Sequence, residues 1–204
     1  MKDSFDSVQA KPVELPNIKN ITISGRIGAG STTLAKGLEE KLGWKHIEGG
    51  EVFWEQVRSR LNLHSKDTHK RPDKEDEDFD AQLKKMLKED EHLILETKLA
   101  GFNAKDIPGV FKILVVCEDT EGNDQTGIRI DRLLNREDIT VEEAKQEVLE
   151  REENDLNKWR KLYAGGDPDW KYWDPKYYDL VVNTYSHNHI QSVNYVLEHI
   201  GYKS

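Results

Sequence analysis

Residues 21–34 read ITISGRIGAGSTTL and contain the first pattern with a chemical meaning. Glycines at 25, 28 and 30 follow a short β-branched run and precede a helical pattern. Glycine at such a turn lets the backbone approach phosphate oxygens, and the first N–H groups of a helix lack intrahelical partners. The spacing of Gly25 and Gly30 is that of a Walker A loop, with Thr32 at the position whose hydroxyl holds Mg²⁺. A plain strand-to-helix turn is the alternative, but the three glycines favour phosphate binding.

The position that usually carries the lysine of this loop holds Ser31 instead. A cation that reaches the β- and γ-phosphates helps to balance the charge of the transition state in phosphoryl transfer. Two interpretations therefore stay open. Either cations from elsewhere in the chain supply that charge, or the protein binds a nucleotide without turning it over.

Five basic side chains later in the sequence are candidates for that charge. Arg129, Arg132 and Arg136 are spaced at i, i+3 and i+7 on one face of a predicted helix, and Arg151 and Lys158 are seven residues apart. A guanidinium group can grip phosphate oxygens with two hydrogen bonds. Alternatively, these cations form ion pairs on a solvated surface. Their candidate partners are Asp131, Glu137, Glu147 and Asp155.

The elements that must position these residues are short apolar runs. The runs lie at 21–23, 93–95, 113–116 and 180–182, with a weaker one at 44–47. Continuous apolar runs are typical of strands that are covered on both faces, and helical patterns separate them. The sequence therefore predicts βαβ units and a parallel sheet. Glu96 directly follows one run, where it could hold a Mg²⁺-bound water or, equally, cap a helix or form a loop salt bridge.

Composition narrows the class of protein. The 204 residues include 39 acidic and 30 basic side chains, a formal net charge of −9, which argues against nucleic-acid or anionic-membrane partners. No apolar run approaches the roughly 20 residues of a membrane span, and residues 1–10 lack a signal-peptide core. The single Cys117 excludes an intrachain disulfide and a cysteine-rich zinc site. We therefore expect a cytoplasmic α/β protein.

Three segments have distinct patterns. Residues 1–16 contain two prolines and no apolar period, so we expect a flexible N-terminal arm. Residues 64–92 contain 17 charged side chains out of 29, which predicts solvated helices rather than core. Residues 129–163 have an apolar stripe interrupted near 137–138, and Thr140 with Glu143 forms a predicted capping box.

Residues 19–200 resemble an archaeal-type cytidylate kinase, within the nucleoside monophosphate kinase family of P-loop NTPases. Ser31-Thr32-Thr33 is similar to the hydroxyl-rich loop of that branch, in which lysine is replaced. Further similarity lies in 46–53 (HIEGGEVF), 95–102 (LETKLAGF), 129–163 and 178–184 (YDLVVNT). Five motifs in the same order make the resemblance specific.

The resemblance implies a three-layer P-loop sandwich over residues 17–204, with a five-stranded parallel sheet of order 2-3-1-4-5. It also implies a helical acceptor-binding arm at about 49–91 and a helical lid at about 118–175. The implied reaction is Mg²⁺-dependent transfer of the ATP γ-phosphoryl group to CMP or dCMP. Lid closure would exclude water. We expect a monomer whose partners are small nucleotides.

The resemblance also assigns roles to residues. The donor phosphates would bind to Gly25, Arg26, Ile27, Gly28, Ala29, Gly30, Ser31, Thr32 and Thr33. Mg²⁺ would bind to Thr32, and to Glu96 through water. The acceptor would bind to Gly50, Phe53, Trp54, Arg58, Lys98 and Gly101. Catalytic charge would come from Lys98, Arg129, Arg132, Arg136, Arg151 and Lys158.

Two departures keep alternatives open. Trp54 and Lys98 stand where the branch has arginines that grip the acceptor phosphate, and Arg58, one turn after Trp54, is the candidate to replace the first of them. These departures favour, as a first alternative, a related kinase with a different small acceptor. The missing loop lysine favours, as a second, a catalytically weak nucleotide-binding or sensing protein.

Overall fold

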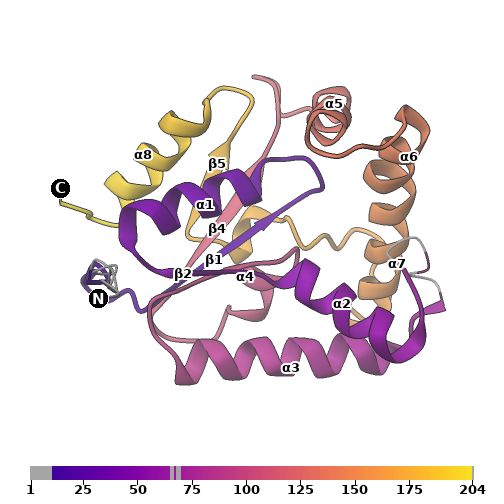
Figure 1. Cartoon of the computed structure of the whole chain (residues 1–204), viewed down its shortest axis with the longest axis horizontal. Helices are drawn as coiled ribbons and strands as arrows, with labels where there is room; N and C mark the ends of the chain where they lie inside the picture. Colours follow the sequence, from indigo (N-terminus) through magenta and orange to yellow (C-terminus); the bar gives the residue numbers. More distant parts are fainter. Residues whose placement is uncertain (1–10, 65–66, 68–69, 204) are drawn as a thin grey trace, which may run out of the picture.

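The computed structural model describes residues 11–64, 67 and 70–203, which form a five-stranded parallel sheet and the helices around it (Figure 1). The strand order is β2-β3-β1-β4-β5, which confirms the predicted order. The strands are β1 Asn20–Gly25, β2 Lys45–Glu48, β3 Leu93–Glu96, β4 Val110–Val116 and β5 Leu180–Asn183. Because neighbouring strands are parallel, their carboxyl ends meet at one edge of the sheet, where ligands of such sheets bind.

Helices cover both faces of the sheet, so that all residues of the central strands β1 and β3 are buried. α1 (Ser31–Leu42) and α8 (His189–His199) pack on one face, in a core that includes Ile23. α3 (Asp73–Glu89) and α4 (Ala100–Asn103) lie on the other face, with Leu95 and Val110 in the core beneath them. The predicted three-layer α/β sandwich is therefore confirmed.

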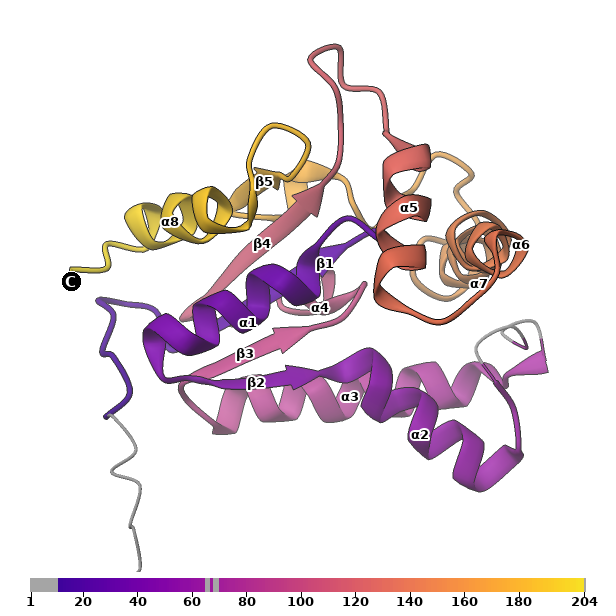
Figure 2. The same ribbon diagram turned by 45° about the horizontal axis from the view of Figure 1, so that its top comes forward.

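Two helical groups flank the carboxyl edge of the sheet. The arm helices are α2 (Gly49–Leu61) and α3. The lid helices are α5 (Thr126–Arg136), α6 (Val141–Lys145), the π-helix η2 (Gln146–Arg151) and α7 (Glu152–Tyr163), and the short 3₁₀ helix η3 (Pro175–Tyr177) precedes β5. Figure 2 shows the two groups on opposite sides of the edge. They lie within the predicted segments 49–91 and 118–175, while their roles as arm and lid remain predictions.

The lid helices begin where the sequence predicts. Thr140 Oγ1 accepts a hydrogen bond from the Glu143 N–H, and the Glu143 carboxylate accepts one from the Thr140 N–H, so the capping box is present. From Val141 the chain runs without interruption through η2 into α7. The π-helical turn is a feature that the sequence pattern did not indicate.

The predicted flexible arm needs a correction over its last residues. The Val13 N–H donates to the Leu42 carbonyl at 2.9 Å, the Val13 carbonyl accepts from the Trp44 indole, and Leu15 is only 8% exposed within the core. Residues 13–15 are therefore part of the folded body, because they cover the end of α1. Residues 1–10 of the predicted arm lie outside the described residues.

The prediction of a wholly solvated segment at 64–92 is wrong for one face of α3. Phe79, Leu83 and Leu87 are buried in the core under the sheet, and two acidic side chains, Asp76 and Asp80, are buried beside them. Charge content described the outer face of the helix. It did not indicate that Asp76 and Asp80, on the inner face, accept hydrogen bonds from residues of α7.

Candidate active site

The loop between β1 and α1, residues 25–33, has the backbone geometry of an anion site. Gly28 and Gly30 have φ values of 76° and 105°, which glycine adopts without strain. Gly30 is the N-cap of α1 and no side chain caps it, so the first N–H groups of the helix can bind an anion. A Cβ atom at Gly28 would lie 2.4 Å from the Arg129 carbonyl oxygen. Position 28 therefore requires glycine.

Glu96, at the end of β3, connects this loop to β2. Its Oε1 accepts hydrogen bonds from Ser31 Oγ at 2.7 Å and Thr32 Oγ1 at 2.8 Å, and its Oε2 lies 3.1 Å from His46 Nε2. Glu96 is 7% exposed, so its carboxylate is held from both sides. Glu96 thus contacts His46 on the neighbouring strand, while its roles in holding a Mg²⁺-bound water, in capping a helix or in a loop salt bridge remain predictions.

The donor set at this point fits Mg²⁺. The described residues contain no group of three or more His, Cys, Asp or Glu side chains that could hold a metal ion. Mg²⁺ usually binds through one or two protein oxygens, with water and phosphate completing its shell. The hydroxyl of Thr32 and the carboxylate of Glu96 are oxygen donors 2.8 Å apart, at the wall of a cavity.

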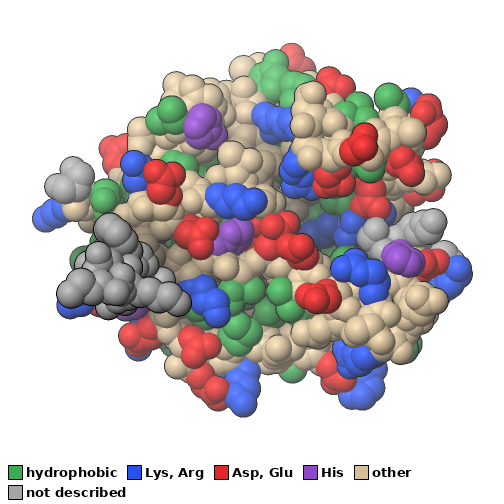
Figure 3. Space-filling view, viewed as in Figure 1, with side chains coloured by type: hydrophobic (Ala, Val, Ile, Leu, Met, Phe, Trp, Pro, Cys, Tyr) green, Lys and Arg blue, Asp and Glu red, His purple; other side chains and the backbone are tan. Residues whose placement is uncertain are grey.

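A cavity of about 880 Å³ opens at the carboxyl edge of the sheet. It is bounded by the loop, by Gly50 of α2, by Lys98 after β3, and by Arg136 and Arg151 of the lid helices. The space-filling view shows the molecule hollowed between the two helical groups, with acidic and basic side chains around the opening (Figure 3). A second cavity, of about 690 Å³, lies between the loop, Arg132 and the segment 184–189.

The five predicted lid cations do not share one environment. Arg132, Arg136 and Arg151 line these two cavities. Arg132 donates to the Thr184 carbonyl at 2.9 Å and to Thr184 Oγ1 at 2.8 Å. Arg136 is half exposed and bonded to the neighbouring Glu137 carboxylate, and Arg151 pairs with Glu147.

Arg129 is buried instead of facing a cavity, which corrects its predicted role as a phosphate-binding residue. Its side chain is 0% exposed. The guanidinium group donates to Asp124 Oδ2 at 3.0 Å, to Glu152 Oε2 at 3.2 Å and to the Ile27 carbonyl at 2.7 Å. Arg26 of the loop also donates to Glu152, at 2.9 Å. Arg129 therefore anchors the loop to the lid helices.

Lys158 is likewise occupied in a structural contact. Its ammonium donates to the Arg71 carbonyl at 2.6 Å and lies 2.8 Å from Asp76 Oδ2. Trp159, the next residue, donates from its indole to Asp76 Oδ1 at 3.1 Å. Tyr163 donates to Asp80 Oδ2 at 2.6 Å. The lid helix α7 is thus fixed to the arm helix α3.

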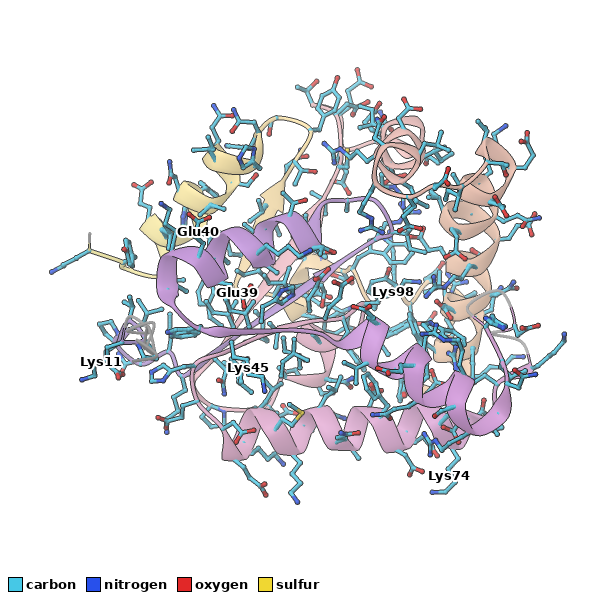
Figure 4. All side chains as sticks on the ribbon, viewed as in Figure 1. Lys11, Glu39, Glu40, Lys45, Lys74 and Lys98 are labelled. Atoms are coloured by element: carbon cyan, nitrogen blue, oxygen red, sulfur yellow. The ribbon has the colours of Figure 1, made fainter. Side chains whose placement is uncertain are left out.

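On the acceptor side, Lys98 lies in the middle of the molecule, between α2 and the lid helices, whereas Lys74 points outward (Figure 4). Lys98 Nζ donates to Asp155 Oδ2 at 2.7 Å. Burial lowers the pKa of Lys98, and the charge of Asp155 opposes that change. Gly50 lines the cavity, and a Cβ atom at this position would have no neighbour within 4 Å. Phe53 and Trp54 line a smaller cavity of about 100 Å³ that Lys98 also borders.

Two predicted acceptor residues do not reach these cavities. Arg58 is exposed on α2 and borders none of the three cavities described above. A Cβ atom at Gly101 would lie 2.3 Å from the ring of Tyr178, so this glycine permits close packing between α4 and the segment before β5. Neither residue lines a cavity next to Lys98 in this arrangement, and their roles in acceptor binding remain predictions.

Arg71 is a site residue that the sequence pattern did not reveal. It is 4% exposed, and its guanidinium carbon lies 4.9 Å from the ring centres of both Phe53 and Trp54. Asp76 accepts two hydrogen bonds from it, at 2.9 and 2.7 Å. Arg71 stood within a charged run, where no spacing distinguished it from solvated neighbours. The available signal was Trp54, a large aromatic side chain at a position where the resemblance implies a cation.

Comparisons with known proteins show the family of the chain. Residues 24–157 match the model of a family described as AAA domain. A cytidylate kinase of Haloarcula marismortui is 32% identical over 166 residues, covering 80% of both chains, and one of Methanopyrus kandleri is 33% identical over 177 residues, covering 80% of this chain and 83% of the relative.

The solved structures show the fold alone. A gluconokinase from Sinorhizobium meliloti superposes with a TM-score of 0.57 at 13% identity, covering 93% of this chain and 94% of the other. A shikimate kinase from Acinetobacter baumannii in complex with shikimate gives a TM-score of 0.54 at 14% identity, covering 90% and 93%. Within the described part of the chain, no helix is long and apolar enough to cross a membrane.

Proposed function

Because the chain belongs to the cytidylate kinase family and to the AAA domain family, we propose that it transfers the γ-phosphoryl group of ATP to CMP or dCMP. The products are ADP and CDP or dCDP. The observation that carries this proposal is the cavity of about 880 Å³, which the phosphate loop, the arm helix α2 and the lid helices all border. A kinase of two nucleotides needs a donor side and an acceptor side that meet in this way.

On the donor side, the backbone of residues 25–33 holds the phosphates and Arg132 borders the adjoining cavity. Thr32 would hold Mg²⁺ through its hydroxyl, and Glu96 would hold one of the metal's waters. The bound cation neutralises charge on the phosphoryl group as it is transferred. Its site is supported by the oxygen pair of Thr32 and Glu96.

The charge that a loop lysine usually supplies comes from Arg136 and Arg151. Both border the same cavity as Ser31, and neither is fully buried. In the transfer, an oxygen of the acceptor phosphate forms a bond to the γ-phosphorus. The bond from that phosphorus to the bridging oxygen breaks, and its electron pair leaves with ADP. The acceptor oxygen is already anionic near neutral pH, so no protein base is needed.

On the acceptor side, Lys98 meets the acceptor phosphate beside Gly50. Lys98 is bonded to Asp155 and stands 5.7 Å from the centre of the Trp159 ring. The aromatic side chains of Phe53 and Trp54 border the adjoining small cavity. Their flat faces suit stacking against a nucleobase.

The proposal is tested by product analysis after incubation with Mg-ATP and each of CMP, dCMP, UMP, AMP and GMP. Formation of CDP or dCDP above the other diphosphates is the expected result. Thr32→Val, which keeps the shape of the side chain and removes the hydroxyl, should abolish it. Thr120→Val, at an exposed position in the segment after β4, is the matched control and should retain activity.

A different small acceptor is the second candidate, and the Lys98–Asp155 pair favours it, because Asp155 competes with an acceptor phosphate for the ammonium group. Product from another monophosphate would keep the kinase and change its substrate. If nucleotide raises the melting temperature by mass action and no diphosphate forms from any acceptor, the protein is a nucleotide sensor and the kinase proposal is wrong.

A further inference from the structure

His46 lies behind the phosphate loop and is not explained by the proposed reaction. It is on β2, which pairs with β3 so that His46 is opposite Ile94 and Glu48 is opposite Glu96. The side chains of His46 and Glu96 are 7% and 9% exposed. The 3.1 Å contact between His46 Nε2 and Glu96 Oε2 is therefore shielded from solvent.

The contacts of Glu96 are divided between its two oxygens. Oε1 accepts from the hydroxyls of Ser31 and Thr32, and Oε2 faces His46. A hydroxyl has one proton and two acceptor lone pairs. Because both protons point to Oε1, the lone pairs of Ser31 and Thr32 are available on the cavity side.

The orientation of the Glu96 carboxylate determines the direction in which the lone pairs of the two hydroxyls point. The terminal torsion of a glutamate side chain is broad, so a carboxylate held at one oxygen can turn. His46 is the contact that holds the second oxygen of Glu96 among the described residues. Removal of that contact would let the two hydroxyls rotate.

We propose that His46 is a positioning residue: through Glu96 it orients the hydroxyls of Ser31 and Thr32 so that the loop binds a divalent cation together with a nucleotide. This inference rests on the proposed function for its metal site. Partners that hold metal ligands from behind typically change metal affinity by 10–100-fold when they are removed.

The test compares two substitutions of similar size. His46→Gln keeps an N–H donor for Glu96, and His46→Leu removes it. His199→Gln is the control, because His199 is exposed near the end of α8 and its Nδ1 contacts only the Tyr195 carbonyl among the described residues. The measurement is ATP affinity by calorimetry at increasing Mg²⁺, with a parallel series in EDTA.

We expect His46→Leu to need about tenfold more Mg²⁺ for the half-maximal gain in ATP affinity, with affinity in EDTA unchanged. His46→Gln should restore most of this loss, and His199→Gln should match the natural chain. Equal Mg²⁺ midpoints for the leucine and glutamine variants would overturn the proposal. If His46→Leu does not fold, His46→Met takes its place in the same comparison.

The outcome is separable from that of the proposed function. A natural chain that binds Mg-ATP and forms no diphosphate refutes the kinase, whereas the Mg²⁺ midpoints still decide the role of His46. A loss of ATP affinity in EDTA as large as that in Mg²⁺ would show a general effect on the loop, and would also overturn the positioning role.

Discussion

Three arginines of α5 illustrate how much a residue's role depends on what lies opposite it. Arg129, Arg132 and Arg136 share one helix face, yet Arg129 is fully buried, Arg132 clasps Thr184, and the Arg136 side chain is 53% exposed. The same residue type thus serves to anchor the loop at one end of α5 and to face the cavity at the other.

We expect Arg129→Ala and Arg136→Ala to separate stability from turnover. Arg129→Ala leaves Arg26, among the described residues, as the one arginine paired with both Asp124 and Glu152, and should lower the free energy of unfolding by about 3 kcal/mol, the lower end of the range for a broken buried pair. Arg136→Ala should change it by less than about 0.5 kcal/mol and lower kcat/KM at least tenfold. Urea unfolding and a coupled ADP assay measure both. A kinetic defect without destabilisation in Arg129→Ala would contradict the anchoring role.

We expect Arg132→Ala to fall between these two, because its guanidinium holds Thr184 and also borders the second cavity. Expressed as free energies, the loss of kcat should be far larger than the loss of stability against unfolding. The same two measurements check this. A loss of melting temperature with no kinetic defect would show that Arg132 only supports the fold.

The sequence could assign these arginines to one face of a helix but not to an environment. The i, i+3, i+7 spacing is a property of α5 alone, whereas the burial of Arg129 comes from Asp124 and Glu152, which arrive from other segments. The loop at 25–30 was predictable because its chemistry is local. Arg71 and His46 were not singled out, because their partners are distant in sequence.

We expect Asp80 to make stability depend on pH. Burial raises the pKa of its carboxyl to about 6, above the value of about 3.9 in an unfolded chain. The folded state therefore binds more protons between these values, and stability falls as pH rises through them. The free energy of unfolding of Asp80→Asn, measured relative to that of the natural chain, should increase by about 2 kcal/mol as the pH rises from 4 to 7. Urea unfolding across this range measures it, with the exposed Asp78→Asn as control; a constant difference would contradict the burial argument.

At the scale of elements, the π-helical turn η2 sets the rotation of α7 relative to α6. A π turn carries an additional residue compared with an α turn, and one residue corresponds to about 100° of helix rotation. Glu152 begins α7 and meets Arg26 and Arg129. The additional residue in η2 therefore determines that Glu152 faces the loop.

We expect deletion of Leu149, which is exposed within η2, to disrupt this contact. If the turn becomes α-helical, Glu152 turns away from Arg129, and unfolding free energy should fall by several kcal/mol, in the range of a broken buried pair. Leu149→Ala keeps the chain length and should have little effect. Equal urea midpoints for the deletion and the substitution would show that η2 does not set the rotation.

Strands and helix starts were predictable from the sequence, while the π turn and the inner face of α3 were not. Apolar runs reveal buried strands, and the Thr140 capping box has a local signature. A π turn has no comparable residue pattern here. The acidic composition around Asp76 and Asp80 predicts exposure to solvent. Both side chains are instead buried against α7, where they accept hydrogen bonds from Trp159 and Tyr163.

At the scale of the whole molecule, charge opposes the approach of a nucleotide. The net charge is −9, and the described residues that line the cavity of about 880 Å³ include seven carboxylates against four Lys or Arg side chains. The acids are Glu48, Asp67, Glu96, Glu137, Glu143, Glu147 and Glu150, and the bases are Arg26, Lys98, Arg136 and Arg151. A free nucleotide is repelled more than its complex with Mg²⁺.

We expect the association rate of ATP in EDTA to rise when salt increases from 20 to 200 mM, because salt shortens the range of like-charge repulsion. The rate for Mg-ATP should change less. Stopped-flow fluorescence of the tryptophans measures both. A rate that falls with salt would show that the cavity cations dominate the approach.

The ion pairs around the cavity have one more consequence, for the heat of binding. Arg136 and Arg151 already hold Glu137 and Glu147, so a phosphate that recruits the guanidinium groups leaves two carboxylates next to its own charge. Binding therefore exchanges two ion pairs within the chain for two with the ligand, and the groups that lose a partner offset part of the gain. The enthalpy of nucleotide binding should consequently be smaller in magnitude than two newly formed ion pairs would give.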